Sequence, residues 1–158
     1  MPVHEEDGDE VDEAEVEILR EGSRLALRTA ILWSIVEAGV VVAGVVAARP
    51  VFAASHSLLK EGASASYWQE ATMPAVLFAL CGGALGILLG WRVVSASGLT
   101  GQRAWLWALM SWMFVMAGGV VAAVLSFGGN PPAIFWVAWV MMSIAGATGL
   151  SVHTLWMG

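Results

Sequence analysis

Four long apolar runs, separated by short polar or Gly/Pro-rich connections, constrain the fold of this 158-residue chain more than any other feature. They cover about residues 29–48, 73–91, 104–127 and 133–157. Each is close in length to the roughly twenty helical residues that cross a hydrocarbon core of about 30 Å. The apolar residues are continuous rather than alternating, which favours helices over the strands of a membrane barrel. We therefore predict an all-α integral membrane bundle of four transmembrane helices.

Acidic residues are concentrated before the first run. Ten of the thirteen acids lie between Glu5 and Glu21, so the net charge of −6 describes this tail and not the body of the protein. The beginning of the tail has too little apolar surface to offset the entropy of ordering. We predict an acidic, partly disordered tail at 1–22 and a transmembrane domain at 23–158. The apolar residues among the charges of 11–27 are compatible with a short interfacial helix that leads into the membrane.

The connections between the runs carry turn signals. Arg49-Pro50 is predicted to end the first span, because proline disfavours helix at the preceding residue. The moderately apolar residues 51–72 predict an amphipathic or re-entrant connection, with a short extra helix as an alternative. The sequence from Gly128 to Pro132, Gly-Gly-Asn-Pro-Pro, is a strong turn signal before the fourth span.

The positions of the basic residues predict the orientation. Five of the seven flank one side of the predicted membrane domain: Arg20, Arg24, Arg28, Arg92 and Arg103. Arg49 and Lys60 lie in the first loop, on the other side. The excess predicts a multi-pass protein of the cell (inner) membrane with both termini in the cytoplasm. No basic cluster points to nucleic acid as a partner. The single cysteine, Cys81, excludes an intramolecular disulfide.

Glu37 is the most informative residue, because it lies near the middle of the first predicted span and follows Ser34 by three residues. An ionised carboxylate at that depth costs several kcal/mol unless it is paired, hydrated or protonated. Membrane carboxylates therefore often mark ion paths, proton relays or contacts with a partner. We predict ion coupling or partner contact for Glu37 and Ser34, with a protonated glutamic acid bonded to a neighbouring helix as the alternative. No Lys or Arg of the chain is expected at this depth.

Small residues recur four apart in every predicted span, as expected where membrane helices pack closely. The residues singled out as a helix-packing interface are Gly82, Gly86 and Gly90 in the second span and Gly118 and Gly119 in the third. Two interpretations remain open at this stage. The glycine faces pack within one bundle, or the face from Gly82 to Gly90 docks another subunit.

Two histidines are candidate ligands, His56 in the first loop and His153 near the end of the fourth span. The predicted topology places them on opposite sides of the membrane, so we do not expect them to hold one haem together. A metal site is not defined by the sequence, and no cofactor is required by it. Because no phosphate-binding loop, nucleophile elbow or zinc-protease motif is present, an enzyme acting alone is not expected.

The stretch from Trp33 to Ala48, followed by Ala54-Ser55-His56-Ser57-Leu58-Leu59, resembles the cation diffusion facilitators, and most of all their short, divergent cation transporters. In that family a Glu-bearing first helix precedes a second helix that opens with Asp-x-x-His-Ser. The resemblance implies a metal-transporting ancestry for the N-terminal part. The position of the family's aspartate is Ala53 here, Lys60 replaces a second aspartate, and two of six spans are missing. His56 alone does not complete a zinc site.

Three hypotheses arise for the function. The first is a non-catalytic accessory subunit of a larger respiratory, photosynthetic or transport complex, with other membrane subunits, copies of itself and lipid as partners. The second is a small cation transporter-like protein that works as a homo-oligomer, with Glu37 as the coupling carboxylate. The third is a haem- or quinone-binding membrane anchor.

Overall fold

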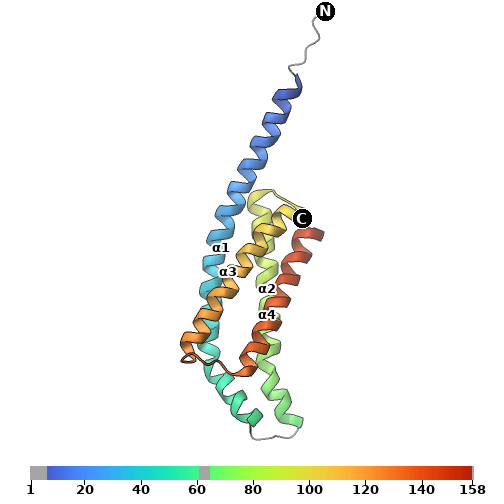
Figure 1. Ribbon diagram of the computed structural model, residues 1–158. Helices are drawn as coiled ribbons and strands as arrows, with labels where there is room; N and C mark the ends of the chain where they lie inside the picture. The colour runs from blue at the N-terminus through green and yellow to red at the C-terminus, as the bar shows by residue number, and fades with distance from the viewer. Residues whose placement is uncertain (1–6, 61–64, 158) are drawn as a thin grey trace, which may run out of the picture.

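Four long helices make up the fold. The computed structural model describes residues 7–60 and 65–157. The helices are α1 (Asp7–Lys60), α2 (Ala65–Ser97), α3 (Gly101–Ser126) and α4 (Ala133–Val152), and a π-helical turn at His153–Met157 follows α4 (Figure 1). Each of the four contains a segment long and apolar enough to cross a membrane. The predicted all-α bundle of four candidate transmembrane helices is therefore confirmed.

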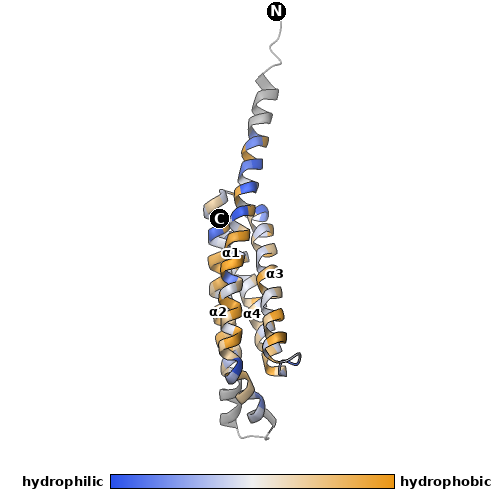
Figure 2. Cartoon of the chain, turned by 90° about the vertical axis from the view of Figure 1, so that its left-hand side faces the viewer, coloured by the Kyte–Doolittle hydropathy of each residue, from blue (hydrophilic) through white to orange (hydrophobic). Residues whose placement is uncertain are grey.

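The helices run alternately up and down, so α1 and α3 are parallel to one another and antiparallel to α2 and α4 (Figure 1). The most extensive packing is between α2 and α4, followed by α1 against α3 and α1 against α2. Because four helices alternate in direction, the C-terminus lies at the same end of the bundle as the point where α1 enters it (Figure 1). Figure 2 shows hydrophobic residues along the bundle and hydrophilic ones where α1 approaches it.

Helix α1 does not end at Arg49-Pro50, so the predicted end of the first span is wrong. It passes through Pro50 to Lys60, and its last part bends toward α2 (Figure 1). Tertiary packing explains the difference. Phe52 is completely buried and makes edge-on ring contacts with Phe78 of α2 and Phe135 of α4, at centroid distances of 5.2 and 5.4 Å. This aromatic cluster holds the chain helical beyond the proline, which removes only a local hydrogen bond.

Because α1 extends to Lys60 and α2 begins at Ala65, the described residues of 51–72 belong to these two helices and form no separate one. Residues 61–64, within the predicted connection 51–72, lie outside the described residues. At the other end, α2 continues to Ser97, six residues beyond the predicted span. Its last two turns contain Ser95 and Ser97, whose hydroxyls donate to the carbonyls of Trp91 and Val93.

The acidic segment is helical from Asp7 onward and continuous with the first span. Residues 1–6 of the predicted tail lie outside the described residues. We call Asp7–Glu21 the α1 extension, because it stands clear of the other helices in Figure 1 and precedes Gly22. Gly22 is buried against Leu99 after the end of α2. The extension is rich in Glu, a residue of high helix propensity, and acids near a helix N-terminus favour its dipole.

The turn predicted between the third and fourth spans is present. Gly128 and Gly129 have φ angles of 64° and 91°, which side chains other than glycine rarely adopt. The amide of Gly129 donates to the carbonyl of Val124 at 2.7 Å and so closes the end of α3. Pro132 then precedes the first residue of α4.

The core on the α4 side combines glycine with tryptophan. Trp112 of α3 is buried against Gly146 of α4, and Trp139 of α4 is buried against Gly119 of α3. The indole N–H of Trp112 also donates to the Ser143 carbonyl at 3.1 Å. A larger residue at either glycine would occupy the space of the indole ring. Tryptophans of membrane proteins are enriched at the lipid–water interfaces, and these two lie inside the bundle because glycines on the facing helix admit them.

Candidate functional site

Glu37 lies on the face of α1 that packs into the bundle. The buried positions of this helix recur at three- or four-residue spacing, as the core stripe of a helix must: Ala30, Ser34, Glu37, Val41, Val45, Phe52 and Ser55. Glu37 is 1% exposed, although it is the only carboxylate on that stripe. The sequence pattern that buries its neighbours therefore buries it as well.

Neither carboxylate oxygen of Glu37 has a hydrogen-bond partner among the described residues. This is uncommon, because buried polar side-chain atoms in native proteins are nearly always satisfied. Such unsatisfied groups have a specific cause, for example a bound ion, a bound water or a functional strain. The side chain is enclosed by its own chain, so a base from another protein cannot reach it without separating the helices.

A cation of α2, Arg92, contacts an aromatic ring of α1. The Arg92 guanidinium stacks on the Trp33 ring at 4.5 Å from its centroid, and Trp33 is one helical turn before Glu37. It also contacts the ring of Trp91 at 4.5 Å. The sequence placed Arg92 outside the second span, whereas α2 continues past it. Its buried Nε has no hydrogen-bond partner in the described part of the chain. The guanidinium instead makes cation–π contacts with the two aromatic rings.

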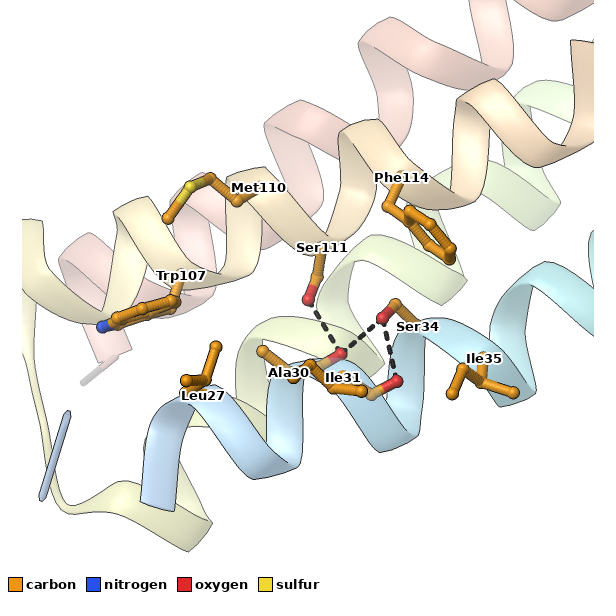
Figure 3. A pocket seen from close by; sticks show the side chains of 9 residues that line it. All are labelled: Leu27, Ala30, Ile31, Ser34, Ile35, Trp107, Met110, Ser111 and Phe114. Carbon is orange, nitrogen blue, oxygen red and sulfur yellow. Dashed lines mark hydrogen bonds between the residues drawn. The ribbon is translucent and has the colours of Figure 1, made fainter. Parts of the chain in front are cut away.

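Ser34 and Ser111 share one acceptor, the Ala30 carbonyl of α1 (Figure 3). The Ser34 hydroxyl donates to the Ala30 carbonyl at 2.6 Å, and the Ser111 hydroxyl of α3 donates to the same oxygen at 2.9 Å. The second bond links α1 to α3. Because both hydroxyls are used for backbone carbonyls, Ser34 does not bond Glu37. The predicted pair is thus neighbouring along the helix without a direct hydrogen bond.

The predicted glycine face of α2 lies against α4 in the same chain. A Cβ atom at Gly82 would lie 2.7 Å from the Met142 Cγ, and one at Gly86 would lie 2.7 Å from the Gly146 Cα. A Cβ atom at Gly90 would lie 3.3 Å from the Leu150 Cα. In α3, Gly119 receives the Trp139 ring, whereas Gly118 has only Ala38 of α1 nearby, at 3.8 Å. Four of the five predicted residues therefore make close contacts within the bundle.

The two histidines lie at opposite ends of the bundle. His56 is near the end of α1 and lines a cavity of about 330 Å³ with Phe127 and the loop residues Asn130–Ala133. His153 begins the turn after α4, near Gly90. Along α1, nineteen residues separate His56 from Glu37, which is about 28 Å at the helical rise. No cluster of three or more metal-ligating side chains occurs within the described ranges 7–60 and 65–157.

Comparison with known proteins gives no relative from which a function can be transferred: no family model, curated protein or solved structure matches this chain. The resemblance to cation diffusion facilitators stays a hypothesis from the residues alone. Any functional proposal must therefore rest on the fold and on the geometry of this chain's own residues, above all those around Glu37.

Sequence reasoning missed Arg92 and Ser111 as neighbours of the site. For Arg92 a signal exists, since Trp91-Arg92 follows an apolar run and aromatic neighbours let an arginine remain partly within a helical span. For Ser111 no comparable signal exists. Its bond depends on the register between α1 and α3, which a single sequence does not specify.

Proposed function

We propose that this chain is a non-catalytic accessory subunit of a larger membrane complex, anchored by the four-helix bundle and docked through the α1 extension. The carrying observation is that this helix of fifteen residues stands beyond the bundle. Its described side chains include two strongly exposed apolar ones, Val16 at 64% and Ile18 at 70% exposure. Apolar side chains exposed to water are unfavourable, and their burial against another surface stabilises. A partner that covers the apolar residues would stabilise the extension.

Charge indicates the chemistry of that partner. The α1 extension contains eight acidic residues and one arginine, which gives a net charge of −7 for Asp7–Glu21. A docking surface of another subunit would therefore be basic, with an apolar centre, because complementary potentials steer association and suppress wrong partners. The positive-inside pattern supports a cytoplasmic position for this surface, in a protein of the cell membrane with both termini in the cytoplasm.

Purification of the full-length protein from native membranes in a mild detergent tests the proposal. We expect it to migrate with at least one other subunit, and we expect Val16→Ser/Ile18→Ser to release that subunit without lowering the melting temperature of the bundle. Leu25→Ser is the control, because it removes an exposed apolar side chain of the same helix outside the extension and outside the groove between α1 and α3. Recovery of only a monomer or homodimer of the wild type would refute an accessory role.

A second candidate function is favoured by Glu37: a small cation transporter-like protein in which this carboxylate binds and releases the transported or coupling cation. The supporting observation is a buried carboxylate with two unused oxygens, which is the kind of group that proton and ion pathways contain. Glu37 lies on the face of α1 that packs into the bundle, and α1 is joined to α3 by the Ser111–Ala30 hydrogen bond. Separation of α1 from its neighbours would expose Glu37.

Reconstitution into liposomes tests this second function separately. With a proton gradient and K⁺ or Zn²⁺ as the trial cations, we expect flux that depends on the wild-type protein and is lost in Glu37→Gln. The control is Glu21→Gln, which changes an exposed glutamate outside the bundle. Equal flux in wild type and Glu37→Gln would exclude Glu37 as the coupling group.

A further inference from the structure

A groove opens on the outer surface of the bundle between α1 and α3 (Figure 3). Its volume is about 310 Å³, at the lower end of the roughly 300–1,000 Å³ of small-molecule sites. Its walls are apolar side chains of both helices, all exposed except the half-buried Trp107: Leu27, Ile31 and Ile35 from α1, and Trp107, Met110 and Phe114 from α3. Because these side chains face outward from a membrane bundle, the groove opens toward the lipid.

The floor of the groove offers nothing to a polar ligand. Its polar side chains are Ser34 and Ser111, and both hydroxyls donate to the Ala30 carbonyl within the protein. A quinone or haem head group would need a free donor or a metal ligand there, since buried polar groups require partners. A hydrocarbon chain needs none and gains van der Waals contact with the walls. The groove therefore fits an acyl chain.

The mouth of the groove is basic. The bond from Ser111 to Ala30 fixes the register of the two parallel helices. Counting eight residues back along each helix places Arg103 level with Gly22, about 12 Å above the bond. Arg24 is within one turn of that level. Helical periodicity puts Arg24 on the face of Leu27 and Ile31, and Arg103 on the face of Trp107 and Met110.

Both arginines are exposed and have no ion pair within the described part of the chain. Arg20 lies one turn further out on the same face of α1. Glu21, also exposed, is three residues before Arg24 along α1. Guanidinium groups are the side chains best suited to bind phosphate, because they donate two parallel hydrogen bonds to its oxygens.

We propose that the α1–α3 groove is a binding site for an anionic glycerophospholipid, with one acyl chain between the two helices and the phosphate between Arg24 and Arg103. The lipid belongs to the leaflet that faces the amino-terminal end of the bundle. A second copy of this chain fits less well. Two parallel copies joined at this groove would bring four arginines together at one membrane surface, and like charges repel.

Native mass spectrometry of the detergent-purified full chain tests the site. The probes are phosphatidylglycerol and phosphatidylcholine with identical acyl chains, added at equal concentration. We expect more bound phosphatidylglycerol than phosphatidylcholine. We expect Arg24→Gln and Arg103→Gln each to lower phosphatidylglycerol binding by about tenfold, the scale of one charge-assisted hydrogen bond. Arg49→Gln, which removes an exposed arginine near the far end of the bundle, is the control and should bind like the wild type.

The acyl-chain part of the proposal has its own variant. Ile31→Trp fills the groove, and we expect it to lower the binding of both lipids while leaving the melting temperature near that of the wild type. Leu32→Trp is the matched control, because Leu32 is exposed outside the groove. Equal binding of the two lipids, or unchanged binding in Ile31→Trp, would overturn the proposal. So would a dimer that Ile31→Trp dissociates while lipid binding stays unchanged, which would assign the groove to a second copy.

Discussion

The two sides of the bundle are built in different ways. On the α4 side, glycines of α2 meet the backbone of α4, and two tryptophans fill glycine positions between α3 and α4. On the α1–α3 side, the described contacts include a hydrogen bond from Ser111 and an ordinary van der Waals approach of Gly118 to Ala38, and a groove opens between the two helices. We infer that stability resides mainly on the α4 side, whereas the groove belongs to the looser side.

The largest effect is expected from Trp112→Ala on the α4 side. The substitution empties the space over Gly146 and removes the hydrogen bond to Ser143, and large-to-small changes of this kind cost about 3–5 kcal/mol. The free energy of unfolding, measured by reversible unfolding in mixed micelles, checks it. Trp156→Ala is the control, because Trp156 is 89% exposed beyond α4, and it should change the value little. A loss under about 1 kcal/mol, the average for point changes, would contradict a core role for Trp112.

Glu37→Met is expected to change stability in the opposite direction. It replaces an unpartnered buried carboxyl with an apolar chain of similar length, so the same measurement should show a gain of roughly 1–3 kcal/mol. Glu37→Gln keeps the shape and a polar head and should gain less. A clear loss of stability in Glu37→Met would mean that the carboxyl group has a stabilising partner. It would contradict the claim that burial of Glu37 lowers the stability of the bundle.

The smallest effect is expected from Ser111→Ala on the α1–α3 side. It removes one hydrogen bond, while the Ala30 carbonyl still accepts from Ser34. Hydrogen bonds between membrane helices average about 0.6 kcal/mol, so we expect a loss of that order in the free energy of unfolding. Thr148→Ala removes an exposed hydroxyl that bonds only its own helix and serves as the control. A loss as large as that of Trp112→Ala would remove the contrast between the two sides.

Much of the fold was predictable, because membrane helices are recognisable from composition and length alone. The four spans and the turn at Gly128-Gly129 required only local information. The predicted end of the first span was wrong because a local rule for Pro50 was applied where distant packing decides. The contacts of Phe52 come from α2 and α4, and no property of residues 49–51 indicates them.

The candidate site was predictable only in part. Glu37 is recognisable from the sequence alone, because a lone acid in an apolar membrane span costs free energy whether its side chain faces lipid or other helices. Its neighbours depend on how the helices are paired and in which register. The stacking of Arg92 on Trp33 and the shared acceptor of Ser34 and Ser111 result from that register. Similarly, the groove exists only because Leu27–Ile35 lies beside Trp107–Phe114.

The most direct test of the two-sided bundle is the difference in unfolding free energy between Gly86→Ala and Gly118→Ala. The added methyl group is identical, yet at Gly86 it meets the backbone of α4, whereas at Gly118 it reaches only the Ala38 methyl at 3.8 Å. We expect Gly86→Ala to lose at least about 2 kcal/mol through overpacking. Gly118→Ala should remain within about 0.5 kcal/mol of the wild type, or gain slightly from helix propensity. Equal losses at the two positions would contradict the division of the bundle into a close-packed and a looser side.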